Sequence, residues 1–462
     1  MRSLLRGLPV LWALALTLPA FGSDIRVPQD HPTIQAAIAA AINGDTVLVD
    51  PGTYTENIDF QGKAITVRST RGPSVTIIDG GASGPVVTFA NFEGSGSVID
   101  GFTIRNGKSD DIGGVFGGGV SCFKASPTIV NNTITGNISD IGGGISIYYS
   151  SHPYVANNVI VDNQSTAGGA GAGIGINALS DPVIKNNLIA RNVGPGLGGA
   201  INVLFNCSPQ IINNTITQNS GGTGGAINVF AASPTVWNSI LWNNSPDEVY
   251  ELGGSGSSTI TYTTVQGGYP GVGNLSNDPS FIDPVLGDFR LDCASPCIDA
   301  GVNLGSPPTH DIEGDLRTVD GDSDGLSIID MGSDEFDTLF RFNGPATGGA
   351  SVSFTSLNPP AKNGQSAQVF LSLSDGSLTG GITIPGSGGQ KLGLGVDPIF
   401  NLWLSLPGLL RQTTLSGCPG AGTFPLTLPG TIPVGLRVYF AGFTTSGGTV
   451  TGVTPTSSLV TQ

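Results

Sequence analysis

The chain has 462 residues, a formal net charge of −16, only 11% charged residues and 71 glycines. An acidic surface of this kind repels nucleic acid and anionic lipid, so we exclude nucleic-acid partners. The length indicates two or three domains, and a glycine share about twice the usual one favours tight turns and close-packed strands over helices.

The first 22 residues predict a secretory signal peptide. Arg2 and Arg6 precede an apolar run from Leu8 to Leu18, which ends at the small-residue site Ala20-Phe21-Gly22. The run is too short to span a bilayer and no later stretch is long enough, so we expect no transmembrane segment. The mature chain would start at Ser23 with a net charge of −18, because two arginines leave with the leader. We therefore expect a secreted protein, extracellular or at the cell surface.

An N-terminal cap is predicted next, at the start of a domain over residues 23–276. Pro32 suits a first helical turn, and Ile34, Ile38 and Ile42 would line one face of a helix. Gly44 would close this helix before a strand at residues 46–49.

One twelve-residue phrase, "SPTIVNNTITGN" in its first copy, occurs in five related versions. The copies start at Ser126, His152, Asp181, Ser208 and Ser233, which lie 26, 29, 27 and 25 residues apart. A repeat of this period indicates a solenoid.

A glycine-led strand with alternating apolar residues occurs in every repeat. Alternation predicts one buried face, and stacked coils turn each buried position into a column along the axis. The four inward columns are Val120, Ile145, Ile174, Ile201 and Ile227; Cys122, Ile147, Ile176, Val203 and Val229; Ile129, Val155, Ile184, Ile211 and Val236; and Ile134, Ile160, Ile189, Ile216 and Leu241. Ser121, Ser146, Gly175, Asn202 and Asn228 would point outward. The pattern predicts a parallel β-helix.

Paired asparagines lie where each coil must bend, between the third and fourth columns. Asparagine tolerates a left-handed backbone, and stacked amides can hydrogen-bond in a ladder. The pairs are Asn131-Asn132, Asn157-Asn158, Asn186-Asn187 and Asn213-Asn214.

These repeats, running from about residue 57 to about residue 264, resemble the pectate-lyase-like superfamily of right-handed parallel β-helices. The fold is shared by lyases, hydrolases, esterases and proteins without known chemistry, so the resemblance concerns fold more than activity. Members that cleave uronates bind Ca²⁺ through aspartates on one outward face and use an arginine or lysine as base. The outward residues of the glycine-led strands here include neither a carboxylate nor a base.

The acids closest to a catalytic cluster lie in the loops that enter these strands. Asp110 and Asp111 follow Lys108, and Asp140 lies one coil later, so two coils could bring the three carboxylates together. We interpret them as solvated loop residues in preference to a site.

Residues 277–336 form an acidic segment of different character. The run Ser295-Pro296-Cys297-Ile298-Asp299-Ala300-Gly301 resembles the choice-of-anchor module of exported bacterial proteins, although Asp334 stands where that module usually has an aromatic residue. Cys293 and Cys297 are close enough to pair, and Cys122, Cys207 and Cys418 are interpreted as buried thiols.

A calcium-like loop lies inside this segment, in "DGDSDG". Asp320, Asp322 and Asp324 occupy positions one, three and five, and Asp330 at position eleven would supply the last ligand. We expect these four residues to bind a structural Ca²⁺ ion, since the carboxylates would otherwise repel each other.

Residues 337–462 lose nearly all charge and contain short strands separated by turns. This pattern predicts an antiparallel β-sandwich and resembles small C-terminal domains of exported repeat proteins. The predicted fold class is therefore all-β: a right-handed parallel β-helix with an N-terminal capping helix, followed by a sandwich-like domain.

Three functions remain open from the sequence. The preferred hypothesis is a non-enzymatic surface protein that binds a polysaccharide or cell-surface glycan or acts in adhesion. The alternative is a Ca²⁺-dependent polysaccharide lyase of the pectate type. The third is a structural spacer, whose eight or nine coils would extend about 40 Å.

Overall fold

The computed structural model describes residues 22–109, 116–252, 256–292, 294–303, 309–319, 321 and 326–336, and beyond residue 340 the backbone of the strands named below. The predicted leader, residues 1–22, therefore lies outside the described residues except for Gly22. No helix in these parts of the chain is both long and apolar enough to cross a membrane.

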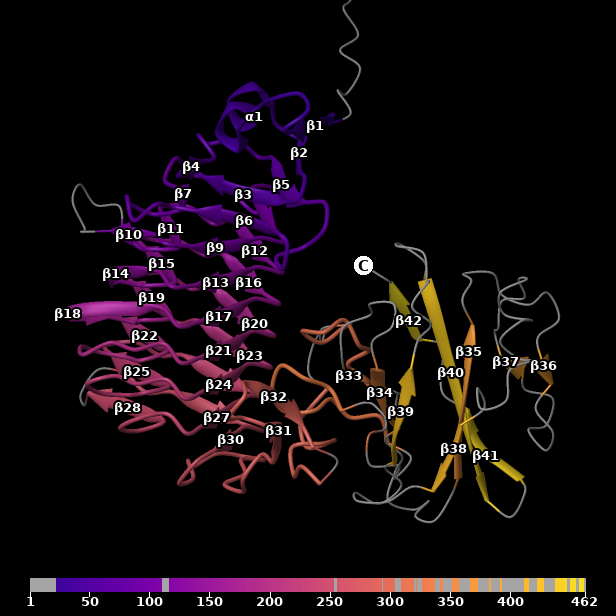
Figure 1. Cartoon of the computed structure of the whole chain (residues 1–462). Coiled ribbons are helices and arrows are strands. Elements are labelled where there is room, and N and C mark those ends of the chain that lie inside the picture. Colours follow the sequence, from indigo (N-terminus) through magenta and orange to yellow (C-terminus); the bar gives the residue numbers. More distant parts are fainter. Residues whose placement is uncertain are drawn as a thin grey trace, which may run out of the picture.

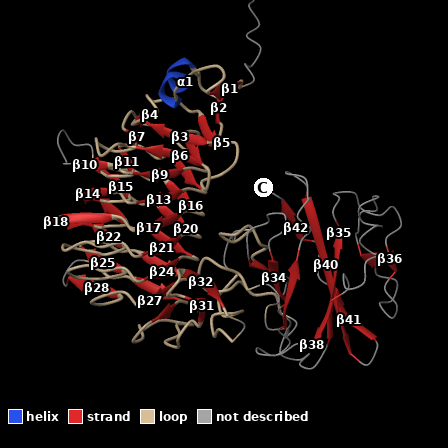
Figure 2. Ribbon diagram, in the orientation of Figure 1, coloured by secondary structure: helices blue, strands red, loops and turns tan. Residues whose placement is uncertain are grey.

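The N-terminal part is a parallel β-solenoid (Figures 1 and 2). Three sheets run along its axis, and in the described residues they contain ten, nine and eight strands. Sheet A contains β1 Asp24–Val27, β2 Thr46–Val49, β5 Thr66–Ser69, β8 Val98–Asp100, β12 Thr128–Val130, β16 Tyr154–Ala156, β20 Val183–Lys185, β23 Gln210–Ile212, β26 Thr235–Trp237 and β29 Thr259–Thr261.

Sheet B contains β3 Gly52–Thr55, β6 Thr76–Asp79, β9 Thr103–Arg105, β13 Thr133–Thr135, β17 Val159–Val161, β21 Leu188–Ala190, β24 Thr215–Thr217, β27 Ile240–Trp242 and β30 Thr264–Val265. Sheet C contains β4 Ile58–Asp59, β7 Val87–Phe89, β11 Val120–Phe123, β15 Ile145–Tyr148, β19 Ile174–Asn177, β22 Ile201–Leu204, β25 Ile227–Phe230 and β28 Val249–Leu252. A short outer sheet contains β10 Lys108–Ser109, β14 Ile138–Ile141 and β18 Gln164–Ala170. Each coil passes from sheet A to sheet B and then to sheet C.

The predicted inward columns are confirmed. The pairing register places Ile145 beside Val120 and Ile174, and the other columns align in the same way. Every residue of the four columns is buried, with at most 1% of its surface exposed. Like side chains thus stack coil upon coil into one continuous core.

The predicted asparagine ladder is also confirmed, at the corner between sheets A and B. The first asparagine of each pair has a left-handed backbone, as at Asn131 with φ 57°. The second is buried: Asn132 donates its Nδ2 to Asn158 Oδ1 at 3.1 Å, and Asn158 donates to Asn187 at the same distance. The ladder continues to Asn214 and then to the hydroxyl of Ser239.

A second ladder, which the sequence reasoning did not identify, follows sheet B. It contains Asn137, Asn163, Asn192, Asn219 and Asn244, the last residue of each phrase, and each amide bonds the next along the axis. Its final acceptor is a carboxylate, that of Glu248. The repeat alignment contained this signal, because these asparagines occupy one column.

A helix, α1 Ile34–Ala40, lies at the N-terminal end of the solenoid (Figure 1). Thr33 caps it, and the Glu56 carboxylate accepts the N–H groups of Ile34 and Gln35. Ile34 and Ile38 are buried in the core of the solenoid, but Ile42 is 60% exposed. The prediction for Ile42 was wrong because the backbone becomes extended at Ala41, so the helical face ends earlier.

The remaining strands pair in antiparallel fashion. β31 Phe281–Asp283 pairs with β32 Asp288–Leu291. A three-stranded sheet contains β33 Arg341–Asn343, β34 Ser351–Ser356 and β39 Gly422–Thr427. A five-stranded sheet contains β35 Ser366–Ser372, β38 Arg411–Thr414, β40 Arg437–Ser446, β41 Thr449–Val453 and β42 Ser457–Val460, and β36 Ile382–Thr383 pairs with β37 Lys391–Leu392. Antiparallel pairing agrees with the prediction for this region, and packing of the sheets as a sandwich stays a prediction.

Candidate functional site

The outer face of the glycine-led strands in sheet C is covered, which corrects the sequence prediction. Ser121, Ser146, Asn202 and Asn228 are each only 1% exposed, and Gly175 is buried. The glycine-rich turns fold back against this face: a Cβ on Gly142 would lie 2.7 Å from Ser146 Cα. The repeated glycines are needed for this close approach. A ligand therefore has no access to this face of sheet C.

The predicted acidic loops are only partly described. Asp110 and Asp111 lie outside the described residues. Asp140 belongs to β14, whose residues Ile138 and Ser139 pair with Lys108 and Ser109 of β10. Asp140 is thus a half-buried strand residue, which corrects its interpretation as a solvated loop residue, and the grouping of the three carboxylates stays a prediction.

The corner between sheets C and A carries a row of apolar side chains, which we call the aromatic ridge. Its residues lie at the ends of the glycine-led strands or just after them, on successive coils: Phe123, Tyr148, Tyr149, Leu179, Phe205 and Phe230. Tyr149 and Phe205 are each 47% exposed, and Leu179 is 57% exposed. The sequence contained a weak signal of the ridge: Tyr149 and Phe205 directly follow their strands, where a turn is expected to be polar, but Lys124 stands at the equivalent place after β11.

Neighbouring rings of the ridge contact each other and a lysine. The ring centroids of Phe123 and Tyr149 lie 5.3 Å apart, and those of Phe205 and Phe230 lie at the same distance. The Lys124 ammonium stands 5.2 Å from the Phe123 centroid and 5.9 Å from that of Tyr149. These distances are within the range of favourable aromatic and cation–π contacts.

Three members of the ridge have a left-handed backbone: Tyr149 with φ 55°, Leu179 with φ 62° and Phe205 with φ 46°. Bulky side chains rarely adopt this conformation, which costs about 1–2 kcal/mol per residue. Their half-exposed side chains recover only part of this free energy by burial. The left-handed conformation belongs to the bend of the coil, since it also occurs at this corner in Lys124, Ala178 and Ala231. The unusual feature of the ridge is that bulky side chains occupy it.

The corner between sheets A and B is covered by the acidic segment, residues 277–336. The outward asparagines hold it: Asn213 Nδ2 donates to the carbonyl of Asp330 at 3.1 Å, and Asn238 exchanges two bonds of 2.9 Å with the backbone of Val302. An apolar cluster of Ile240, Leu291, Cys297, Met331 and Phe336 joins the segment to sheet B. The segment is thus packed on the flank of the solenoid.

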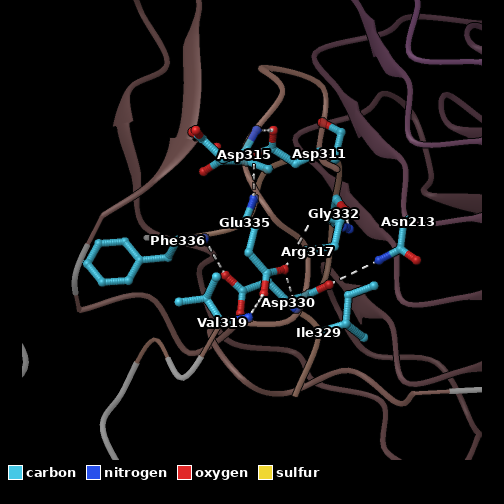
Figure 3. Close-up of polar contacts among 12 residues, drawn as sticks. Asn213, Asp311, Asp315, Arg317, Val319, Ile329, Asp330, Gly332, Glu335 and Phe336 are labelled. Carbon is cyan, nitrogen blue, oxygen red and sulfur yellow. Dashed lines mark hydrogen bonds and ion pairs between the residues drawn. The ribbon is translucent and has the colours of Figure 1, made fainter. Parts of the chain in front are cut away.

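A buried ionic network lies inside this segment (Figure 3). Arg317, Asp330 and Glu335 are each at most 1% exposed, and Arg317 Nη1 lies 3.8 Å from Glu335 Oε2. Burial raises the pKa of both carboxyl groups, and the positive charge of Arg317 opposes this increase. The network was not predicted: Asp330 was interpreted as a Ca²⁺ ligand, and no pattern in the sequence connects it to Arg317 or Glu335.

The described part of the calcium-like loop has other partners. Asp320, Asp322 and Asp324 lie outside the described residues. The carboxylate of Asp330 accepts the N–H of Asp299 at 2.7 Å and that of Phe336 at 2.6 Å. These bonds give Asp330 a role in joining two loops, and its role as a Ca²⁺ ligand stays a proposal.

One further group of acids could offer oxygen ligands. Asp311, Glu313 and Asp315 bring carboxylate oxygens within 4.8 Å of one another. Asp311 Oδ1 already accepts the N–H groups of Glu313 and Asp315, and its Oδ2 accepts that of Glu335. The arrangement fits a hydrogen-bonded turn.

The cysteines act as buried thiols where they are described. Cys122, Cys207 and Cys297 are free and buried, and burial raises the pKa of Cys207 and Cys297 to about 11. The free thiol of Cys297 corrects the predicted link to Cys293, since its sulfur instead lies 3.2 Å from Thr264 Oγ1. Cys293 and Cys418 lie outside the described residues.

Comparison with known proteins identifies the solenoid. Residues 57–238 match the family model described as "Right handed beta helix region". The solenoid is a right-handed β-helix. A solved structure of a mutant pectin methylesterase in complex with a hexasaccharide is similar at a TM-score of 0.24 and 11% identity, over 59% of this chain and 98% of that chain. No curated protein matches the chain.

Proposed function

We propose that this β-helix protein is exported and binds a polysaccharide or cell-surface glycan without cleaving it. The observation that carries the proposal is the aromatic ridge. Flat exposed rings offer apolar faces to the C–H surfaces of sugar rings. The exposed rings of Tyr149 and Phe205 lie two coils apart, about 10 Å along the axis, with Leu179 between them. A polymer can therefore contact several coils at once.

The location of the ridge supports binding over a purely structural role. The glycine-led face of sheet C is covered by turns, and the corner between sheets A and B is covered by the acidic segment. The ridge keeps Tyr149, Leu179 and Phe205 exposed in a strained backbone. The predicted leader supports export. The same proposal includes attachment of the protein to the cell exterior through residues 277–336. It also includes a Ca²⁺ ion bound in this segment.

Affinity electrophoresis of the mature chain in gels containing different polysaccharides tests the proposal. Tyr149→Gly and Phe205→Gly remove a ring but suit a left-handed backbone, so the fold should keep its melting temperature. Each change should weaken binding about tenfold, because a stacked ring contributes about 0.5–1.5 kcal/mol. Tyr154→Ala, on the outer face of sheet A, is the matched exposed-aromatic control.

Two results would reject the proposal. One is unchanged binding in the ridge variants together with loss in Tyr154→Ala. The other is absorbance from a newly formed unsaturated bond during incubation with uronans and Ca²⁺, abolished by Asp140→Ala. The second result would support the lyase alternative.

A further inference from the structure

The two asparagine ladders end differently at the C-terminal end of the solenoid. The ladder at the corner between sheets A and B ends on neutral groups: Ser239 Oγ accepts from Asn214, and Thr263 Oγ1 accepts from Ser239. The second ladder ends on Glu248, whose carboxylate accepts the N–H of Asn244 at 3.0 Å and its Nδ2 at 2.6 Å. The last asparagine of a ladder needs only a hydrogen-bond acceptor for its N–H groups. In the first ladder this acceptor is an uncharged hydroxyl, so a carboxylate is not required.

Burial of the Glu248 carboxylate lowers the stability of the folded protein. Glu248 is only 7% exposed, and no ion pair among the described residues involves Asp247, Glu248 or Glu251. Burying a carboxylate without a cation is unfavourable, and neutral amide donors compensate for only part of the lost hydration. Burial accordingly raises the pKa of Glu248 to about 7. The fold by itself gives no reason for a carboxylate here.

A pocket of about 370 Å³ lies beside this carboxylate. It lies between the segment that enters β28 and the turn after β30, where a further coil would otherwise stack. The residues that line it include Asp247, Glu248, Val249, Val265 and Tyr269. Pockets of about 300–1,000 Å³ commonly hold small molecules.

We propose that this pocket binds a small organic cation with a primary ammonium group, which pairs with Glu248. The ammonium would supply the missing counter-charge, Asp247 would add a second negative charge at the pocket, and the carbon skeleton would pack on Val249, Val265 and Tyr269. Tyr269 Oη donates to Glu251 Oε1 at 3.0 Å, which holds the ring in place. This site is separate from the aromatic ridge and does not depend on glycan binding there.

Isothermal titration calorimetry of the mature chain at pH 7.5 tests the site. Glucosamine and N-acetyl-lysine amide carry the ammonium on a sugar and on an amino acid, so they distinguish the two sources of this group. N-acetylglucosamine is the matched neutral probe. We expect at least one ammonium probe to bind with Kd below 10 mM, no binding of N-acetylglucosamine, and at least tenfold weaker binding to Glu248→Gln.

Two further measurements test the site even if Glu248→Gln does not fold. One uses a control variant with a changed surface charge, and the other varies the pH with the unaltered protein. Asp278→Asn removes an exposed charge elsewhere and should leave the affinity unchanged. Binding of N-acetyl-lysine amide to the unaltered protein should weaken about 25-fold from pH 7.5 to pH 5.5, because protonation of Glu248, with its pKa of about 7, removes the counter-charge. The other charged groups near the pocket are Asp247 and Glu251, with Tyr269 bonded to the latter.

The proposal is overturned if neither ammonium probe binds at 10 mM. It is also overturned if Glu248→Gln and Asp278→Asn weaken binding equally, or if Ca²⁺ alone binds in a Glu248-dependent manner while both ammonium probes do not.

Discussion

Two corners of the same coils flank sheet A and carry outward side chains of opposite character. At the corner with sheet B these are asparagines, and residues 277–336 pack over them through backbone hydrogen bonds. At the corner with sheet C they are aromatic or apolar, and Tyr149 and Phe205 remain half-exposed. Asn131 lies at the first of these corners but is exposed and bonds Asp100, so an outward asparagine permits the segment to pack there and does not by itself determine it.

The largest expected effect comes from the ladder beneath the covered corner. Asn187→Ala should lower the free energy of unfolding by about 3–5 kcal/mol, because it leaves the buried amides of Asn158 and Asn214 without their partner. Denaturant unfolding measures this change. Asn157→Gly, which alters the outward asparagine of a neighbouring coil, should lower it by less than about 1 kcal/mol. Equal losses in both variants would contradict the distinction between inward and outward asparagines.

The charged ladder end should make stability depend on pH. The pKa of Glu248 rises from 4.5 to about 7 on folding, so the folded state holds its proton over a pH range in which the unfolded state has lost it. The contribution of Glu248 is therefore full below pH 4.5 and declines as the pH rises through 7, by about 3 kcal/mol at pH 8. Asp330 and Glu335 act in the same direction, since burial raises their pKa values too. Glu248→Gln isolates the effect: its unfolding free energy should fall less between pH 5 and pH 8 than that of the unaltered protein, and parallel curves would refute the assignment.

The covered corner can be weakened with one change. Asn238→Gly keeps the left-handed backbone, φ 51°, but removes two hydrogen bonds to Val302. Amide exchange at Val302 should accelerate by the equivalent of about 1–3 kcal/mol, with little change in the core of the solenoid. Asn131→Gly is the matched control, since Asn131 bonds the side chain of Asp100 and does not contact the acidic segment. Unchanged exchange in Asn238→Gly would show that apolar contacts alone hold the segment.

The smallest effect concerns Ca²⁺ in the segment over the covered corner. At ten times its Kd the ion should stabilise the protein by about 1.4 kcal/mol, which corresponds to a few degrees in melting temperature. Differential scanning fluorimetry with Ca²⁺ and with chelator measures this shift, and Asp322→Ala should lose it. The proposal fails if chelator leaves the unfolding of the native chain unchanged.

The local regularities of the repeat could be predicted from the sequence. The alternation of apolar residues predicted that Ile145 and Ile174 point inward, and the paired asparagines predicted the ladder through Asn158 and Asn187. Both predictions follow because coils of equal length stack, so that equivalent residues of neighbouring coils contact each other. The same alignment contained the second ladder and a weak signal of the aromatic ridge. Neither was predicted, because Asn137 and Phe205 were assigned no structural role from the sequence.

The outer layer could not be predicted in this way. Alternation predicts that Ser146 leaves the core, but the turn at Gly142 covers it. Ile42 fits a helical period, but the backbone leaves the helix at Ala41. A period assigns a residue to a face of its own element and contains no information on what packs against that face.

The sequence by itself determined the repeat, its inward columns and the ladder at the corner between sheets A and B, since each follows from neighbours that are identical by repetition. The tertiary structure alone decided which outer surfaces are accessible, how Arg317, Asp330 and Glu335 meet, and where Glu248 meets a pocket. Those contacts join residues far apart in the chain and outside the repeat. Their free energies depend on burial and on charge, and both are properties of the folded arrangement.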